Sequence, residues 1–332
     1  MELPVKVSII MLAYNIDRYI ETAIKSVLAQ KTNYRIQLVI SEDCSTDRTL
    51  EICTHYAERY SDRITLVRHE QNVGLQRNFM DAHQHCTGEY IAICDGDDYW
   101  INKHKLQRMT DFMDAHPDFS TCFHRVVNYY EEDQSKSLSN GHQAVVTNIT
   151  HLAQSNYITN SSSLFRRAYF KELPEWFSQI TSCDYAMHLL NAQYGNIYYF
   201  KTPMAVYRKH NKGIWSEAQV EKRQYAALHV RALLLDHFKS QEVVYHHLRH
   251  AYRNIAFYLI RYYRSVGADE GKITETFERI GQYYPEQTLE ELRQQERDEA
   301  VRCHARSLRQ RVFSLLSKVR EVVSRWIPLP KI

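Results

Sequence analysis

The segment EYIAICDGDDYW, residues 89–100, places three carboxylates around one glycine directly after an apolar run. An ionised carboxylate is costly to place beside a buried strand, and Asp95, Asp97 and Asp98 repel one another unless a cation neutralises them. A divalent metal is the simplest such cation, and carboxylate oxygens suit Mg2+ or Mn2+. A solvated turn after a buried strand would show the same pattern. The surrounding sequence has to decide between a metal site and a polar turn.

Apolar runs typical of buried strands alternate with helical patterns along the N-terminal part of the chain. The runs lie at 5–15, 37–41, 63–69 and 89–94. Apolar residues recur at helical spacing between these runs and again at 103–115. Strands that alternate with helices of this length predict right-handed βαβ units. We therefore expect an α/β fold, with a mostly parallel central sheet covered by helices on both faces.

Unusual polar residues stand where three of these strands end. Tyr14 and Asn15 follow the first strand, Asp43 follows the second, and Asp95 and Asp97 follow the fourth. In parallel sheets, ligands bind at the carboxyl ends of the strands. We therefore expect these side chains to line one ligand-binding crevice.

The alternation loosens in the second half of the chain. Strands are predicted at 119–130 and 162–166, and two short strands at 196–200 and 204–208. From about 216 to 300 the apolar pattern is helical throughout, which predicts an added helical lobe.

The composition is that of a folded globular protein, because 44% of the 332 residues are hydrophobic and 24% are charged. The seven cysteines are odd in number and show no Cys-x-x-Cys spacing, which indicates neither a disulfide framework nor a structural zinc site. No charged and apolar leader opens the chain, and no apolar window approaches the roughly 18 residues of a membrane-spanning helix. We expect a cytoplasmic protein.

Three motifs in this order resemble the family 2 glycosyltransferases of GT-A fold: VSIIMLAYN at 7–15, EDCSTD at 42–47 and DGDD at 95–98. Each motif stands at a predicted strand end, and Asp184 and His210 follow where that family has functional residues. The resemblance covers residues 5–212.

The resemblance implies a GT-A type, Rossmann-like sandwich as the catalytic domain at 1–215. Its nucleotide-sugar half would span about 1–118 and its acceptor half about 119–215. The helical lobe at 216–300 and a C-terminal segment at 301–332 would be additions to it.

The resemblance also implies which residues bind the nucleotide. Ala13, Tyr14 and Asn15 would lie along the base, and the Tyr14 ring would be free to stack on it. Asp43 would accept a hydrogen bond from the N3–H group of uracil or a similar base.

Two further residues complete this set. Arg77 matches a basic position near the nucleotide, and Asp95 would face the ribose or the water shell of the metal. The plain alternatives are a core aromatic at Tyr14 and a solvated surface arginine at Arg77. Cys44 stands where the family commonly has glycine, which makes the turn after the second strand less permissive.

The catalytic and metal-binding residues implied by the resemblance are Asp97, His210 and Asp184. Asp97 would be the direct metal ligand, and His210 would approach the metal and the diphosphate. Asp184 matches the catalytic base, which takes the proton of the attacking acceptor hydroxyl. A bound Mn2+ or Mg2+ would stabilise the departing diphosphate. The plain alternatives are a structural His210 and an Asp184 that only caps a helix.

One base with direct displacement implies inversion at the anomeric carbon. The Gln-x-x-Arg-Trp motif of processive synthases is absent from the chain. The resemblance therefore implies a non-processive hexosyl- or N-acetylhexosaminyltransferase. It would move one sugar from a nucleotide-sugar, with a UDP-sugar favoured, to a glycan or lipid-linked saccharide in surface polysaccharide biosynthesis.

Two other classes of protein are weighed against this one. A metal-dependent sugar-phosphate nucleotidyltransferase usually shows an early glycine-rich phosphate loop, whereas the loop at 13–18 has no glycine. A non-catalytic sugar-nucleotide binding protein would tolerate the loss of Asp97 or Asp184, yet both are present.

The positive charge gathers at the C-terminal end, where residues 301–332 hold eight Lys or Arg and one Glu. Apolar residues recur at helical spacing from 308 to 326, which predicts a basic amphipathic helix. Residues 306–327 could lie on an anionic membrane, at the inner face of the cell membrane, or pack on protein. No nucleic-acid partner is expected, because the predicted crevice is acidic.

Overall fold

The computed structural model describes residues 4–139, 141–170, 172–210, 220–303 and 305. The chain divides into two compact units, Met1–Ala251 and Tyr252–Ile332. The first unit therefore extends past residue 215 and includes helix α8 (Val220–His237) and the start of α9 (Glu242–Val266). The finer division of the chain at residues 215 and 300 stays a prediction, and the predicted helix at 306–327 lies outside the described residues.

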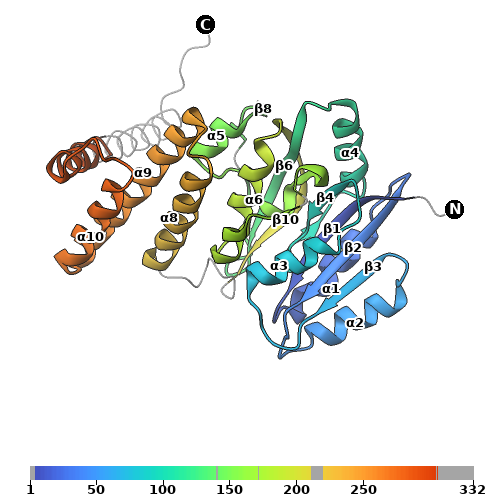
Figure 1. Ribbon diagram of the computed structural model, residues 1–332. Helices are drawn as coiled ribbons and strands as arrows, with labels where there is room; N and C mark the ends of the chain where they lie inside the picture. Colours follow the sequence, from blue (N-terminus) through green and yellow to red (C-terminus); the bar gives the residue numbers. More distant parts are fainter. Residues whose placement is uncertain (1–3, 140, 171, 211–219, 304, 306–332) are drawn as a thin grey trace, which may run out of the picture. The chain divides into compact units, whose positions relative to one another are not determined.

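One ten-stranded sheet forms the centre of the first unit (Figure 1). Its strand order is β3-β2-β1-β4-β9-β6-β10-β5, with β7 paired to β6 and β8 paired to β10. The strands are β1 (Val5–Ala13), β2 (Arg35–Glu42), β3 (Ile64–Arg68), β4 (Tyr90–Ile93), β5 (Tyr99–Trp100), β6 (Phe119–Tyr130), β7 (Lys136–Leu138), β8 (Val146–Thr147), β9 (Leu164–Arg166) and β10 (Asn196–Lys209).

Strands β3, β2, β1 and β4 are parallel to one another, as the alternation of strands and helices predicts. The sheet continues through β9, which is antiparallel to both β4 and β6, and then through β10, which is parallel to β6. The predicted α/β fold with a mostly parallel sheet is confirmed. The segment at 196–209 is one strand instead of the two short strands predicted, with a register shift between Phe200 and Ala205.

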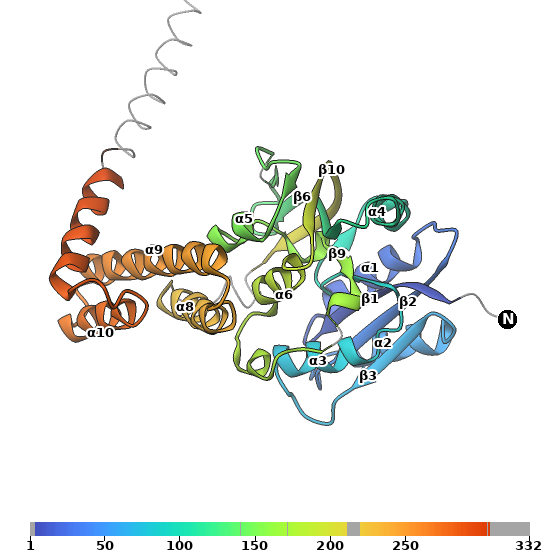
Figure 2. The ribbon, with the colours of Figure 1, turned by 45° about the horizontal axis from the view of Figure 1, so that its top comes forward.

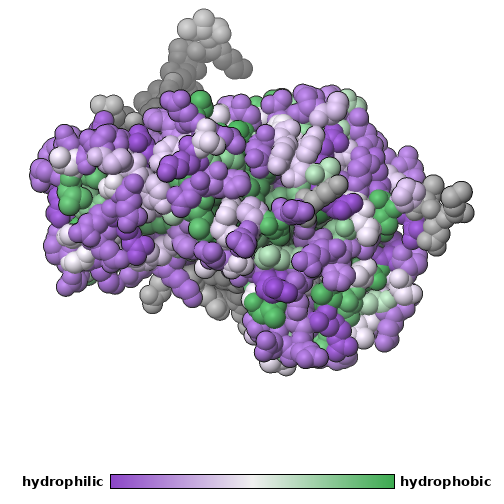
Figure 3. Space-filling view, in the orientation of Figure 1, coloured by the Kyte–Doolittle hydropathy of each residue, from purple (hydrophilic) through white to green (hydrophobic). Residues whose placement is uncertain are grey.

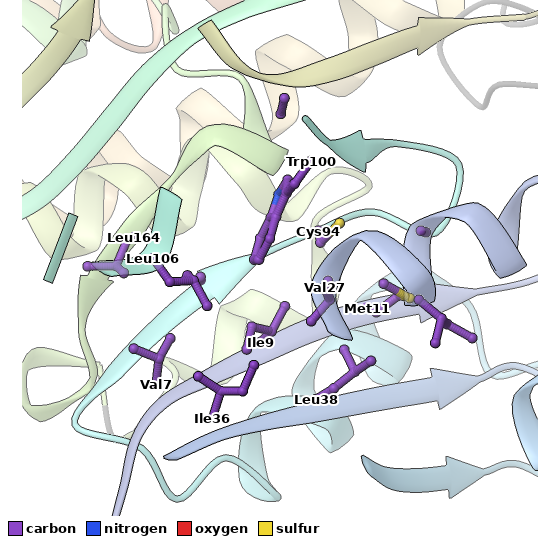
Figure 4. Packing of buried hydrophobic residues seen from close by; sticks show 14 of the residues in the cluster. Val7, Ile9, Met11, Val27, Ile36, Leu38, Cys94, Trp100, Leu106 and Leu164 are labelled. Atoms are coloured by element: carbon purple, nitrogen blue, oxygen red, sulfur yellow. The ribbon is translucent and has the colours of Figure 1, made fainter. Parts of the chain in front are cut away.

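Helices cover both faces of this sheet. They are α1 (Asp17–Leu28), α2 (Thr49–Arg59), α3 (Leu75–Gln84), α4 (Lys105–Ala115), α5 (Ile149–Gln154) and α6 (Cys183–Ala192). Val7, Ile9 and Met11 of β1 share one core cluster with buried residues of α1, α2 and α4 (Figure 4). Helix α3 packs on β1 and β2 and also contacts α6 (Figure 2). Strands covered on both faces are continuous apolar runs, and β4 is accordingly buried along its whole length.

The second unit is helical. It contains the later part of α9, helix α10 (Glu270–Gly281) and a helical run at 289–303. Buried Phe257, Phe277 and Leu292 contribute to its core. The carboxylate of Glu296 is fully buried and pairs with Arg264. A buried charge requires such a partner, so this ion pair fixes the run at 289–303 against α9.

Hydrophilic residues cover most of the face shown in Figure 3, with small apolar areas between them. In the described parts of the chain, no helix has both the length and the apolar character needed to span a bilayer.

Candidate active site

The loop after β4 carries the three carboxylates, and the structure gives each a different surrounding. Asp98 is fully buried, and its Oδ1 accepts a hydrogen bond from the backbone N–H of Arg208 on β10 (2.9 Å). Asp95 is half-buried and is held by Asn160. Asp97 keeps 31% of its side chain exposed. Asp97 is therefore the carboxylate of this loop that is most available to a ligand.

Gly96 permits this loop to lie close to the end of β1. A Cβ atom at this position would lie 2.7 Å from the carbonyl oxygen of Leu12, closer than real Cβ contacts. The glycine is thus required by the close approach of two backbones at the edge of the sheet.

Asp97 and His210 lie side by side, although 113 residues separate them in the sequence. The Nε2 atom of His210 is 3.1 Å from Oδ2 of Asp97. The imidazole ring packs on the ring of Tyr19 with 4.8 Å between ring centroids, and Tyr19 donates its hydroxyl to Glu131 (2.7 Å). Arg208 donates to the backbone carbonyl of Asp97 (3.0 Å). The two residues predicted as metal ligands are thus adjacent. Tyr19 supports the ring of His210, and Arg208 holds the backbone of Asp97.

The electrostatics of the loop favour a bound cation. Burial raises the pKa of the Asp95 carboxyl and of the Asp98 carboxyl, and the charge of Asp97 raises both further. Hydrogen bonds from Ser161 act in the opposite direction on both groups. A cation beside this loop would relieve the repulsion among the carboxylates.

The pair formed by Asp97 and His210 fits a divalent metal. It offers one carboxylate oxygen and one imidazole nitrogen, both common metal ligands. Within the ranges that the model describes, no group of three or more His, Cys, Asp or Glu side chains is arranged around a metal position. Mg2+ in nucleotide sites is commonly bound through one or two carboxylates together with phosphate oxygens and water. The residues present are therefore sufficient for a metal that is shared with a nucleotide.

Asp184 lies in the first turn of α6, two residues after the N-cap residue Ser182. Its Oδ1 accepts a hydrogen bond from the Ser182 hydroxyl (2.5 Å), and its Oδ2 accepts one from Nδ2 of Asn156 (3.1 Å). Burial is the largest cause of the raised pKa of Asp95, and the charge of Asp184 raises that pKa slightly further. Asp184 is half-buried and oriented by neighbouring side chains, and the N-cap position itself belongs to Ser182.

The ends of β1 and β2 are tied together by Asn15. Its Oδ1 accepts a hydrogen bond from the backbone N–H of Thr46 (2.8 Å), and its own N–H donates to the hydroxyl of Ser45 (3.0 Å). Ala13 is buried, whereas Tyr14 is 47% exposed. The structure thus leaves the Tyr14 ring accessible and uses the Asn15 side chain to fix the turn.

Asp43 is buried and accepts hydrogen bonds from the backbone N–H groups of Val73 (2.7 Å) and Gly74 (3.0 Å). It therefore fixes the loop that leads into α3. Cys44 adopts a φ of 57°, the left-handed conformation in which the family commonly has glycine. Arg77 is 66% exposed and forms an ion pair with Asp81 on the surface of α3 (3.0 Å). The geometry of Arg77 is that of a solvated surface residue.

Several residues at the site were not identified from the sequence. Asn156, Asn160 and Ser161 contact the carboxylates Asp184 and Asp95. Their only signal in the sequence is the polar run SNYITNSSS at 155–163, which is also typical of an ordinary loop.

The α/β fold with its mostly parallel central sheet is that of the GT-A glycosyltransferases. Staphylococcus aureus TarS, residues 1–349 in complex with UDP-GlcNAc, has a similar fold, with a TM-score of 0.61 and 19% identity over 84% of this chain and 80% of that 1–349 chain. The mannosyltransferase PcManGT from Pyrobaculum calidifontis, solved with GDP-Man and Mn2+, has a TM-score of 0.54 and 17% identity over 86% of this chain and 84% of its own.

The chain belongs to glycosyl transferase family 2, whose model matches residues 8–181. The uncharacterized protein Rv1520 of Mycobacterium tuberculosis is 33% identical over 223 residues, which are 66% of this chain. The chain spans 63% of the length of that relative. The putative glycosyltransferase EpsE of Bacillus subtilis is 39% identical over 111 residues, which are 33% of this chain and 39% of EpsE.

Proposed function

We propose that this protein is a metal-dependent, inverting, non-processive glycosyltransferase that moves one hexosyl or N-acetylhexosaminyl group from a nucleotide-sugar to a hydroxyl of a glycan or lipid-linked saccharide. The observation that carries the proposal is the adjacency of Asp97 and His210, 3.1 Å apart beside Asp95. Family membership supports transfer of a sugar, and it argues against the nucleotidyltransferase that the carboxylates alone would also allow.

In this proposal, Asp97 and His210 hold a Mn2+ or Mg2+ ion. When bound, such an ion stabilises the negative charge that develops on the departing nucleoside diphosphate. Asp95 contacts the ribose or the water shell of the metal. Tyr19 keeps the imidazole of His210 in place, because its ring packs on one face and its hydroxyl is fixed by Glu131.

Asp184 acts as the general base. Its carboxylate takes the proton of the acceptor hydroxyl while that oxygen bonds to the anomeric carbon and the bond from this carbon to the diphosphate oxygen breaks. A single displacement inverts the anomeric configuration. We therefore expect an α-linked donor to give a β-linked product, and NMR of the anomeric proton checks this expectation.

The donor is proposed to be a UDP-sugar. Tyr14 offers an exposed ring for stacking on the base, with Ala13 and Asn15 beside it. Asp43 already accepts two backbone hydrogen bonds, and a carboxylate has about four acceptor positions, so it retains capacity for the base N3–H group. The similarity in fold to TarS, which was solved with UDP-GlcNAc, supports the same choice. Arg77 contributes to the nucleotide site only if it leaves Asp81.

A role in surface polysaccharide biosynthesis is proposed from the relatives. One of them is the putative teichuronic acid biosynthesis glycosyltransferase TuaG of Bacillus subtilis, 38% identical over 32% of this chain and 41% of TuaG. The protein would act in the cytoplasm, where thiols stay reduced, because all seven cysteines are free. Residues 306–327 would bring it to the inner face of the membrane.

The test is hydrolysis of a panel of UDP-, GDP- and dTDP-sugars with Mn2+, with Mg2+ and with EDTA. We expect slow, metal-dependent release of one nucleotide, and loss of that release in Asp97→Ala and in Asp184→Ala. Binding of a nucleotide-sugar without turnover would instead indicate a non-catalytic binding protein. The proposal is refuted if the protein neither binds nor hydrolyses any donor of the panel.

A further inference from the structure

One loop of the acceptor half touches both the predicted base and the predicted donor-side carboxylate. This loop, the 155–163 segment, has the sequence SNYITNSSS and connects α5 to β9. Its first part contacts Asp184 and its last part contacts Asp95 and Asp98. These three carboxylates come from two separate parts of the chain, the β4 loop and helix α6.

At the beginning of the segment, Asn156 orients the carboxylate of Asp184. Its Nδ2 donates to Oδ2 of Asp184 (3.1 Å), while its Oδ1 accepts from the backbone N–H of Ile158 (3.3 Å). The second contact fixes which end of the amide faces the carboxylate. Because Ser182 donates to the other oxygen of Asp184, both oxygens of that carboxylate are held in place.

At the end of the segment, Asn160 and Ser161 hold the β4 loop. Nδ2 of Asn160 donates to both oxygens of Asp95 (3.0 and 3.2 Å). The hydroxyl oxygen of Ser161 lies 3.0 Å from Oδ2 of Asp95 and 2.5 Å from Oδ2 of Asp98. Ser161 also accepts a hydrogen bond from the backbone N–H of Asp95 (3.2 Å).

The segment is itself anchored in the core. The carbonyl oxygen of Ser161 accepts hydrogen bonds from the indole of Trp100 (3.1 Å) and from the fully buried Lys105 (3.1 Å). Ser162 and Ser163 are fully buried and donate back to the carbonyls of Thr159 and Asn160. Residues 161–163 are buried and hydrogen-bonded to the core, so this end of the segment has little freedom to move and can hold the β4 loop in a fixed position.

We propose that the 155–163 segment is a positioning element that sets the base Asp184 relative to the donor-side carboxylate Asp95. The inference rests on the proposed function, because it concerns the geometry of that same reaction. In a direct displacement the base must lie on the face of the sugar opposite the leaving group, and a displacement of about 1 Å can cost about 100-fold in rate. The two asparagines and Ser161 would supply this alignment through the carboxylates that they hold, without contacting the substrate.

The test separates the two ends of the segment by their effects on kcat and on nucleotide affinity. Asn156→Ala is expected to lower kcat for donor hydrolysis about 10- to 100-fold, with the Kd for Mn2+ and UDP unchanged within about twofold. Asn160→Ala and Ser161→Ala are expected to raise that Kd about 10-fold, since loss of groups that orient a ligand site typically weakens metal binding by this factor. Calorimetry measures the Kd, with GDP or dTDP in place of UDP if the donor panel selects them.

Ser162→Ala is the matched control. It removes an equally buried hydroxyl from the same turn, but that hydroxyl bonds a backbone carbonyl and no carboxylate. We expect kcat and Kd within about twofold of the wild type.

The inference is overturned if Asn156→Ala keeps kcat within threefold of the wild type, or if Ser162→Ala changes kcat and Kd as much as Ser161→Ala. Asn160 is half-buried, so its variant gives a result even if Ser161→Ala does not fold. If the wild type hydrolyses a donor and Asn156→Ala, Asn160→Ala and Ser161→Ala all keep its kcat and Kd, this inference is wrong and the proposed function stands. If the wild type neither binds nor turns over a donor, both the inference and the proposed function are wrong.

Discussion

Replacing Asp184 by asparagine should remove the base while keeping the local structure. The carboxylate now accepts from Ser182 on one oxygen and from Asn156 on the other. The carboxamide of Asp184→Asn can direct its oxygen to the Asn156 amide and its NH2 group to the Ser182 hydroxyl, which can accept as well as donate. Both hydrogen bonds and the side-chain volume are retained, so the free energy of unfolding should change by about 1 kcal/mol or less.

The effect on catalysis should be far larger than the effect on stability. A general base typically contributes 10²- to 10⁴-fold, which corresponds to about 3–5 kcal/mol in the activation free energy. The carboxamide has no basic oxygen able to take the acceptor proton, so kcat should fall by about this factor. Asp97 and His210 are untouched, and the affinity for a nucleotide with Mn2+ should therefore stay within about twofold.

Three measurements check this prediction together: the steady-state rate of nucleotide release, the Kd by calorimetry and the free energy of unfolding in urea. Ser182→Ala is a useful comparison, because it removes one orienting hydrogen bond and leaves the base in place. A kcat within threefold of the wild type for Asp184→Asn would show that another group takes the proton. An unfolding free energy lowered by more than about 2 kcal/mol would show that the exchange of hydrogen-bond partners does not occur.

Three further predictions follow from single residues. His210→Ala should weaken binding of UDP with Mn2+ by at least about 10-fold in calorimetry, and an unchanged Kd would argue against a metal at Asp97. Cys44→Gly should be about 1 kcal/mol more stable in urea than Cys44→Ala, because glycine adopts the φ of 57° without strain; the reverse order would contradict this. Burial lowers the pKa of His83 to about 4, so the unfolded chain binds its proton first and stability should fall between about pH 6.5 and 4, by about 3 kcal/mol in total. Urea unfolding at several pH values measures how the free energy of unfolding falls as the pH is lowered. This fall should be smaller for His83→Leu than for the wild type, and an equal fall would contradict the argument.

The sequence predicts the fold of the first unit well because its signals are local. Buried strands such as β4 are apolar along their whole length, and the residues that end them are polar and adjacent in the chain. The strand predicted at 162–166 is present as β9, but its antiparallel pairing with β4 and β6 was not predicted, because that pairing joins residues far apart in the sequence. The length of β10 was missed because a register shift after Phe200 interrupts its apolar pattern.

The site is predictable only in part, because its contacts join residues that are far apart in the sequence. Asp97 and His210 are found through the family resemblance, since nothing in their spacing of 113 residues brings them together. The roles of Asn156 and Ser161 depend on contacts with single atoms of distant carboxylates, and serine and asparagine are ordinary loop residues. The role of Arg77 stays a prediction, because its position matches the family while its side chain forms a surface ion pair with Asp81 in the structure.

The three carboxylates of the β4 loop repel one another, which is why the sequence predicts a metal beside them. The structure gives each of the three a different surrounding. Asp98 accepts a hydrogen bond from the backbone N–H of Arg208, and Asp95 accepts one from Asn160. The single hydroxyl proton of Ser161 is shared between the two carboxylates. These hydrogen bonds offset part of the cost of burying the two groups, but burial still raises the pKa of both carboxyls. Asp97 keeps 31% of its side chain exposed and has His210 as its side-chain neighbour. In the proposed function, a cation that reduces the repulsion among the three carboxylates would bind at Asp97 and His210, where a nucleotide could share it.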